Sequence, residues 1–142
     1  MAAELHDIGK AAIPDTILKK PAALNDGELE FIRTHTVIGE RIMLAAPSLA
    51  PLASMVRSSH ERFDGAGYPD GLRSTQIPPG AAIIAVCDAF DAMVAGRSYR
   101  DAIRVEDALQ ELHRCAGSQF DPKVVEAFVA VCTAGNPAVA SV

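Results

Sequence analysis

The sequence predicts an all-α fold built as a single domain. Apolar residues recur at steps of three and four along several segments, and no segment shows a convincing strand period. Proline and glycine separate these segments. The 142 residues, 49% of them hydrophobic, suffice for one packed core. That core must be mostly aliphatic, because aromatic residues make up only 5% of the chain.

The N-terminal part is expected to begin inside a helix that Gly9 stops or loosens, followed by a short turn around residues 15–18. A second helix is expected to begin at the N-cap candidates Asn25 and Asp26 and to run to about Ala46. Its inward face is predicted to contain Ile32, His35, Ile38, Gly39 and Ile42.

A third helix is expected after Ser48, which can cap it, and a long irregular loop should follow from Asp64 to Gly80. Glycine and proline are too frequent in that loop for regular structure, and loops of such length are usually functional or disordered. The inner face of the third helix is predicted to contain Leu52, Val56, Ser59 and His60.

Three more helices are expected in the C-terminal part. The first covers residues 81–94, with Gly96 as its stop signal, and the second covers residues 105–115, with Gly117 as its stop signal. The last begins at Asp121–Pro122, which fit an N-cap and an N1 proline. The apolar residues of the last two helices are Ala108, Leu109, Leu112, Val124, Val125, Phe128 and Val131.

Composition and charge exclude several classes of protein. The net charge of −5 argues against a protein that coats nucleic acid, and no apolar run approaches the ~20 residues of a membrane span. The start of the chain does not resemble a signal peptide. Its three cysteines, odd in number and widely spaced, indicate free thiols. We therefore expect a cytoplasmic protein, with a domain over residues 1–133 and a flexible tail over residues 134–142.

The pair His6–Asp7 indicates a metal centre. Imidazole and carboxylate together suit divalent first-row metals, and the two oxygens of an aspartate can bridge two ions. Two adjacent ions can stabilise both the attacking and the leaving oxygen of a phosphoester displacement. His35, His60 and Asp88 each lie on the apolar face of a different predicted helix, as ligands in a bundle core do. The sequence thus favours phosphate-ester hydrolysis.

Each of these residues also has a less specific interpretation. A single histidine on an apolar helix face is more often a hydrogen-bonded core residue than a ligand. Asp88 lies in an apolar run, where an unpaired buried carboxylate would cost several kcal/mol. A metal, protonation, or an ion pair with Arg62 or Arg97 must therefore compensate it. That all five residues are unrelated polar residues of the core is less expected than that they form one metal centre.

A series of motifs resembles the HD-GYP domain. The matching residues occur in order and with suitable spacing over roughly residues 2–130, which is far more specific than one His–Asp pair. They are Leu5–Lys10, Ile13–Asp15, Leu18–Pro21, His35–Gly39, His60–Leu72, Ile77–Pro78, Asp88–Met93, Arg97–Arg100 and Ala116–Pro122.

The resemblance implies an all-α bacterial phosphodiesterase of the HD superfamily. It implies two or three ions of the iron or manganese type. It also implies cyclic di-GMP as the substrate, hydrolysed to linear pGpG or on to GMP. The implied partners are receiver domains and GGDEF-type synthases, whereas no nucleic-acid polymer and no membrane is expected.

By the same resemblance, the matched metal ligands are His6, Asp7, His35, His60 and Asp88, with Asp7 as the bridging one. The expected catalytic residues are Asp7 and Lys10. The matched substrate contacts are Lys10, Gly67, Tyr68, Pro69, Arg97 and Arg100. The cationic groups among them suit a phosphodiester, although an ordinary surface charge is the alternative for Arg100. Glu61 and Asp64 match residues expected to orient the histidines.

Two features depart from the family pattern. Ser59 occupies the first position of a paired-histidine motif, and serine is a poor ligand because its hydroxyl stays protonated near pH 7. The family also has helices before its His–Asp pair that carry further ligands, whereas five residues precede His6 here. We therefore expect weak metal occupancy, and an uncovered apolar surface that could support a homodimer.

These observations leave two main functions open. One is a metal-dependent phosphodiesterase that hydrolyses cyclic di-GMP. The other is a catalytically degenerate module that binds cyclic di-GMP or another protein. A different HD-type phosphohydrolase acting on nucleotides is a third, against which the long Gly/Pro-rich loop argues.

Overall fold

The computed structural model describes residues 1–95 and 102–135. Their regular structure is helical, which confirms the predicted all-α class; the described ranges add only an isolated bridge between Ala116 and Phe120. Among the described helices none is long and apolar enough to cross a membrane. The elements, with η for a 3₁₀ helix, are α1 (Ala2–Leu5), η1 (Ile8–Ala12), α2 (Asp15–Leu18), α3 (Asp26–Arg33), α4 (His35–Ala45), η2 (Ala50–Leu52), α5 (Ala53–Arg57), η3 (Ser74–Gln76), α6 (Pro79–Val94), α7 (Val105–Arg114) and α8 (Pro122–Gly135).

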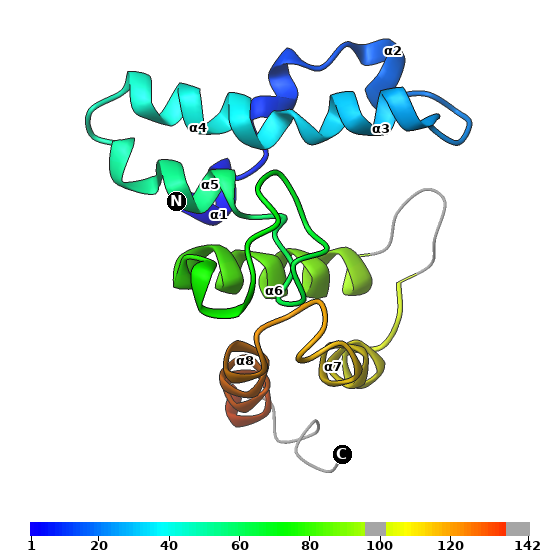
Figure 1. Cartoon of the computed structure of the whole chain (residues 1–142). Helices are drawn as coiled ribbons and strands as arrows, with labels where there is room; N and C mark the ends of the chain where they lie inside the picture. The colour runs from blue at the N-terminus through cyan, green and yellow to red at the C-terminus, as the bar shows by residue number, and fades with distance from the viewer. Residues whose placement is uncertain (96–101, 136–142) are drawn as a thin grey trace.

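The helices form two tiers (Figure 1). The N-terminal tier comprises α1 to α5, in which α4 packs against η1 and α5. The C-terminal tier comprises α6 to α8, each of which packs against the other two. Contacts of α1 and α5 with α6 join the tiers. The long loop, residues 58–78, leaves α5 and lies across α6 in this view.

Two glycines let neighbouring elements approach α4 closely. A Cβ at Gly9 of η1 would lie 1.9 Å from the carbonyl oxygen of His35, and a Cβ at Gly39 of α4 would lie 2.8 Å from a methyl carbon of Val56 in α5. Gly9 was expected to stop or loosen the first helix, but α1 already ends at Leu5 and Gly9 lies inside η1. What Gly9 provides is the absence of a side chain at a backbone contact.

The helix predicted over residues 25–46 is divided in two. Its start is confirmed: the Asn25 side chain accepts from the N–H of Glu28 at 2.9 Å, and the Glu28 carboxylate accepts from the N–H of Asn25 at 2.9 Å. Thr34 separates α3 from α4, and its N–H donates to the Phe31 carbonyl at 3.1 Å. That three-residue step tightens the helix. One shifted hydrogen bond thus divides a segment whose apolar pattern is continuous.

The buried face of α4 also differs from the prediction. His35 and Gly39 are buried as expected, but Met43 rather than Ile42 faces the core, and Ile42 is 39% exposed. The face follows four-residue steps from His35 through Gly39 to Met43. The small core of the N-terminal tier consists of Met43, Ala53 and Val56.

Ser48 does not cap the third helix, contrary to the prediction. The chain enters that helix through η2, whose N-cap residue is Leu49 and makes no side-chain cap hydrogen bond. Because the 3₁₀ turn runs directly into α5, the α-helix itself begins only at Ala53. Val56 and Ser59 are buried as expected, and Ser59 lies after the end of α5.

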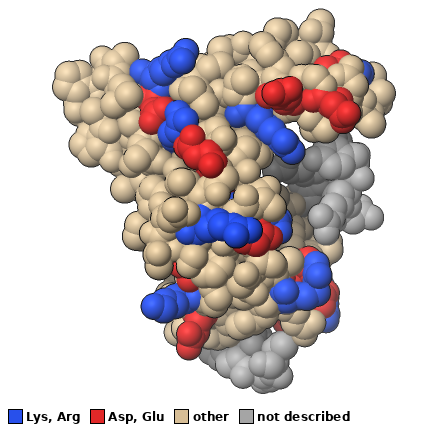
Figure 2. Space-filling model, in the orientation of Figure 1, with Lys and Arg blue, Asp and Glu red and all other residues tan. Residues whose placement is uncertain are grey.

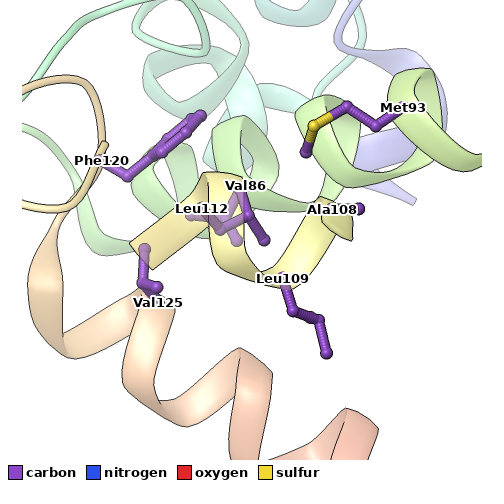
Figure 3. Packing of buried hydrophobic residues seen from close by; sticks show 7 residues of the cluster. All are labelled: Val86, Met93, Ala108, Leu109, Leu112, Phe120 and Val125. Carbon is purple, nitrogen blue, oxygen red and sulfur yellow. The ribbon is translucent and has the colours of Figure 1, made fainter. Parts of the chain in front are cut away.

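The C-terminal tier contains the larger apolar core (Figure 3). α7 buries Ala108, Leu109 and Leu112, as its pattern predicts. α8 begins at Pro122 as predicted, and the Asp121 carboxylate accepts from the N–H of Lys123 at 2.8 Å. The fully described core of this tier consists of Val86, Met93, Ala108, Leu109, Leu112, Phe120 and Val125.

The remaining boundaries of this tier shift by a few residues. α6 begins at Pro79 rather than at Ala81, because a proline fits the first turn of a helix. The end assigned to Gly96 lies outside the described residues. α8 continues through Thr133 to Gly135, beyond the predicted end of the domain, and Val131 on it is 73% exposed.

The long loop is tied to both tiers by hydrogen bonds. The N–H groups of Phe63 and Asp64 donate to carbonyls of Gln119 and Ser118, at 3.1 and 2.8 Å, in the turn before α8. On the other side, Arg57 of α5 binds the Asp70 carboxylate at 2.7 Å and the Glu40 carboxylate of α4 at 2.6 Å. The loop therefore lacks regular structure apart from η3, yet it is fixed at both sides.

Acidic and basic side chains are interspersed on the face shown in Figure 2. Among the described residues, Arg114 pairs with Glu111 within α7, and Arg104, the N-cap residue of α7, pairs with Asp107. This face carries no broad basic patch of the kind that tracks a nucleic-acid backbone.

Candidate metal centre

Five predicted ligands converge between the two tiers. His6 and Asp7 connect α1 to η1, His35 begins α4, His60 follows α5, and Asp88 lies in α6. The Nε2 atom of His6 lies 3.6 Å from Oδ2 of Asp7 and 3.7 Å from Oδ1 of Asp88. Ligand atoms of His6, Asp7 and His60 all lie within 4.8 Å of one another. The geometry therefore offers nitrogen and oxygen donors at a spacing that a bound cation could bridge.

The two oxygens of Asp7 face different partners. Oδ1 lies 3.4 Å from Nε2 of His35 and 3.9 Å from Nε2 of His60. Oδ2 faces His6 and accepts a hydrogen bond from the Lys10 ammonium at 2.5 Å. The two oxygens of this carboxylate therefore lie beside different nitrogen atoms of the centre.

The Asp7 carboxyl is held in its ionised form. Burial alone would raise its pKa, but contacts with His35, His60 and Lys10 outweigh burial and hold that pKa well below its ordinary value. A carboxylate must be deprotonated to bind a metal. Asp7 meets that condition throughout the physiological pH range.

Backbone carbonyls orient two of the histidines. Nδ1 of His6 lies 2.6 Å from the carbonyl oxygen of Ala3, and Nδ1 of His35 lies 2.6 Å from that of Ile32. A carbonyl can only accept, so each Nδ1 carries a proton, and in a neutral ring Nε2 then has the lone pair that a metal ion requires. The sequence reasoning missed these two carbonyls, although each precedes its histidine by three residues.

Four buried atoms of the centre have no hydrogen-bond partner among the described residues. They are Nε2 of His6, His35 and His60, and Oδ1 of Asp7. Buried polar atoms are almost always paired, because leaving one unpaired costs about 1–3 kcal/mol. A divalent cation satisfies nitrogen lone pairs and a carboxylate oxygen together. The residues present therefore fit a metal ion.

Asp88 is less buried than its apolar neighbours suggest. Its side chain is 41% exposed, so the expected unpaired carboxylate in the core is not found. Arg62 was one expected partner, but it pairs instead with Asp64 at 2.7 Å. Arg97, the other, lies outside the described residues. The exposure arises because Asp88 faces a cavity rather than the packed interior.

That cavity adjoins the centre and has a volume of about 260 Å³. It lies between α3, α6, the long loop and the turn before α8, and its lining includes Arg33, His60, Gly67, Tyr68, Asp88 and Gln119. The volume is just below the range of about 300–1,000 Å³ that is usual for small-molecule sites. A ligand in the cavity would lie directly beside His60 and Asp88.

Tyr68 and Gly67 shape the cavity wall. The Tyr68 ring stacks on His60, with centroids 5.2 Å apart and planes 9° from parallel. Burial raises the pKa of the Tyr68 hydroxyl, so the phenol stays protonated and can donate a hydrogen bond. A Cβ at Gly67 would lie 2.3 Å from the backbone nitrogen of Arg62, so only glycine fits there. The Tyr68–Pro69 peptide bond is cis.

A protein-family model described as an HD domain matches residues 1–124. The chain belongs to the HD domain family. It is 46% identical over 130 residues to a cyclic di-GMP phosphodiesterase of Thermotoga maritima. It is 41% identical over 131 residues to the cyclic di-GMP phosphodiesterase response regulator RpfG of Xanthomonas campestris. These alignments cover 90% and 91% of this chain and 35% of each relative.

Other relatives are named for a different cyclic dinucleotide. This HD domain is 40% identical over 127 residues to the 3'3'-cGAMP-specific phosphodiesterase 2 of Vibrio cholerae, covering 88% of this chain and 24% of that protein. The crystal structure of the cyclic GMP-AMP specific phosphodiesterase V-cGAP3 of V. cholerae matches with a TM-score of 0.66 and 20% identity, covering 96% of this chain and 37% of that one. That match shows the fold. The chain spans about a third of the length of the first two relatives.

Ser59 is not placed as a ligand in this HD domain. Its side chain is buried, and its hydroxyl donates to the carbonyl oxygen of Val56 at 2.9 Å. The hydroxyl therefore points back along its own chain. The expectation that serine adds little to the centre agrees with this geometry.

Glu61 and Asp64 do not orient histidines among the described residues, contrary to the expectation. The buried Glu61 carboxylate accepts from the N–H groups of Asp70 and Leu72, at 2.7 and 3.0 Å. Asp64 pairs with Arg62 and accepts from the N–H of Ala66. Both carboxylates stabilise the long loop, because its turns leave backbone donors that a helix would have satisfied.

The predicted phosphate contacts are only partly described. Lys10 lies beside the centre and pairs with Asp7, whereas Arg97 and Arg100 lie outside the described residues. The structure adds Arg33, at the end of α3, to the lining of the cavity. Sequence reasoning missed Arg33 because a basic residue near a helix C terminus is common.

Proposed function

We propose that this HD domain is the phosphodiesterase domain of a protein that hydrolyses cyclic di-GMP. The observation that carries the proposal is the set of four unpartnered buried atoms on His6, Asp7, His35 and His60. They face one another beside a cavity of about 260 Å³. The relatives reported above are named as phosphodiesterases of cyclic dinucleotides, which supports the substrate class.

The proposed ligands are the five residues of the centre, and iron or manganese is the proposed metal. Their nitrogen and oxygen donors suit such first-row ions. A bound divalent ion supplies Lewis acidity and a nucleophilic water at neutral pH. The protein supplies the orientation: Ala3 and Ile32 fix the rings of His6 and His35, and Asp7 divides its oxygens between two sides.

The side chains around the cavity have separate proposed tasks. The Lys10 ammonium is close enough to Asp7 to offset negative charge that develops on the phosphoryl oxygens. Tyr68 can donate a hydrogen bond or stack on a base. Arg97 and Arg100 remain proposed phosphate contacts, and the product is pGpG, GMP or both.

Metal content and turnover together test this proposal. We expect protein prepared with Mn(II) or Fe(II) to retain the metal on desalting and to hydrolyse cyclic di-GMP, measured by elemental analysis and chromatography of the products. Asp7→Asn keeps the shape but weakens the ligand, and should lower activity by at least about 100-fold. Arg41→Gln, on the exposed side of α4, is the control. The proposal is contradicted if the metal-loaded protein shows no turnover and Asp7→Asn leaves the metal content unchanged.

A second candidate is a domain that binds a cyclic dinucleotide without hydrolysing it. The observation that favours it is that Ser59 replaces an expected histidine ligand and donates its hydroxyl to the carbonyl oxygen of Val56. Nucleotide binding without turnover would support this function. Gain of activity in Ser59→His would identify the lost ligand as the cause.

The proposed partners follow from the family and stay predictions. They are receiver domains, GGDEF-type synthases and a second copy of the chain through apolar surface. The described part of the chain has an apolar groove between α6 and α8, formed by Ile83, Val124, Ala127, Phe128 and Val131. Light scattering of the purified protein measures the oligomeric state. A cytoplasmic location likewise stays a prediction.

A further inference from the structure

Two arginines line the cavity beside the metal centre, and they differ in their charge partners. Arg62 is neutralised by Asp64, with Nη2 at 2.7 Å and Nε at 3.2 Å from its oxygens. Arg33 makes no ion pair or side-chain hydrogen bond with the residues of the two described ranges. Of the two arginines, Arg33 is therefore the one whose charge is available to a ligand in the cavity.

Arg33 is positioned by an aromatic contact. Its guanidinium carbon lies 5.2 Å from the centroid of the Tyr68 ring, within the range of a cation–π interaction. The same ring stacks on His60, 5.2 Å away. Tyr68 belongs to the part of the long loop where the missing side chain of Gly67 allows close backbone packing. An exposed arginine is therefore connected through one ring to a proposed metal ligand.

A simpler function for Arg33 is to stabilise the end of α3, where the last turn favours a cation. That function accounts for the sign of the charge. It does not require the side chain to lie over Tyr68 or to line the cavity. Arg41 on α4 is likewise exposed and without an ion pair among the described residues, but it does not line this cavity.

We propose that Arg33 binds a phosphate of the substrate at the cavity beside the metal centre. The inference rests on the proposed function and adds a substrate contact to it. A planar guanidinium binds a phosphate through two parallel hydrogen bonds, which a point charge cannot do. Arg62 already pairs with Asp64 and Lys10 with Asp7. Arg33 has no carboxylate partner among the described residues, so its guanidinium can bind a phosphate without first giving up an ion pair.

The proposal places Arg33 in binding rather than in the chemical step. Tyr68 lies between the Arg33 guanidinium and the centre in the chain of contacts, whereas Lys10 touches Asp7 directly. Loss of Arg33 should therefore raise KM and the dissociation constant of the nucleotide. It should leave kcat and the retained metal largely unchanged, which distinguishes it from loss of a ligand.

The test compares Arg33→Gln, Arg33→Lys and the matched control Arg41→Gln in the metal-loaded protein. For Arg33→Gln we expect KM for cyclic di-GMP to rise about tenfold or more, as loss of a charged hydrogen bond commonly gives, with kcat within about twofold. Arg33→Lys should recover only part of the loss, and Arg41→Gln should match the wild type. Thermal unfolding confirms that each variant folds.

A binding measurement with pGpG, by calorimetry, gives the same comparison without turnover. Equal dissociation constants for Arg33→Gln and Arg41→Gln overturn the assignment of Arg33. If the wild type hydrolyses bis(p-nitrophenyl) phosphate but not cyclic di-GMP, the proposed substrate is wrong, and KM for that probe still tests the phosphate contact. A wild-type protein that binds none of these phosphate esters overturns both proposals.

Discussion

The two tiers of the molecule are stabilised in different ways. The C-terminal tier has an apolar core of seven buried residues from α6, α7, α8 and the turn between the last two. In the described N-terminal tier the clustered core consists of only three buried residues, Met43, Ala53 and Val56. Yet four of the five proposed ligands belong to the N-terminal tier or the start of the long loop. The centre therefore lies mainly among backbone contacts and polar interactions, and Asp88 of α6 connects it to the helices of the larger core.

This difference predicts that the two tiers respond differently to substitution. A change in the backbone contacts of the N-terminal tier should disturb the metal centre before it unfolds the chain. A cavity in the C-terminal tier should lower stability while leaving the ligand geometry intact. Long-loop ion pairs, which lie at the surface, should have the smallest effect.

The largest effect on the centre is expected from Gly9→Ala. The new Cβ would lie 1.9 Å from the His35 carbonyl oxygen, so η1 must move away from α4 and carry Asp7 with it. We expect metal affinity to fall by about 10–100-fold or more, measured by competition with a chelating dye. Gly27→Ala is the matched control, because its nearest atom would be 3.5 Å away and alanine favours a helix. Equal affinities for both variants would show that the η1–α4 contact does not position the centre.

The next effect is expected from Leu112→Ala in the C-terminal tier. Leu112 is completely buried, so its truncation should lower the free energy of unfolding by about 2–5 kcal/mol. Denaturant unfolding measures this, and Val131→Ala, at a residue 73% exposed, should change little. Metal affinity of the folded Leu112→Ala protein should stay near that of the wild type. A loss as large as that of Gly9→Ala would mean that the tiers are not independent.

The smallest effect is expected when acid weakens the ion pair between Arg62 and Asp64 at the surface of the long loop. Arg62, and then the N–H of Ala66, lower the pKa of Asp64 from its ordinary 3.8 to about 2. Because the folded-state pKa is the lower one, this stabilisation is fully present above pH 3.8 and is lost as the pH falls toward 2. In a titration followed by NMR, Arg62→Gln should return the pKa of Asp64 toward 3.8. An unchanged pKa would mean that Ala66 alone accounts for the shift.

Local sequence features predicted the elements that depend on local contacts. The boundaries of α7 and the start of α8 follow from an amphipathic pattern and from the Asp121–Pro122 cap. The start of α3 was likewise predicted from the N-cap candidate Asn25. The division at Thr34 was not, because its dihedral angles remain helical and only one hydrogen bond shifts.

Features that depend on distant segments could not be predicted in this way. Gly9 reads as a helix breaker until the carbonyl of His35 is placed against it. The convergence of the ligands agrees with the motif resemblance, but the bonds of Glu61 to the loop backbone were not foreseen. Arg33 precedes His35 by two residues, and only the fold shows that it lies over Tyr68.

The contacts of Nδ1 in His6 and His35 have a consequence for how the centre matures. Each Nδ1 contacts the carbonyl oxygen of the residue three positions earlier in the chain. The imidazole orientation is therefore encoded by sequence-local geometry, and the tautomer is selected before any ion arrives. The rings of His6 and His35 are therefore already oriented before a cation binds, so binding requires little rearrangement of these two side chains. Reversible removal and return of the metal should accordingly leave the protein in the same conformation each time.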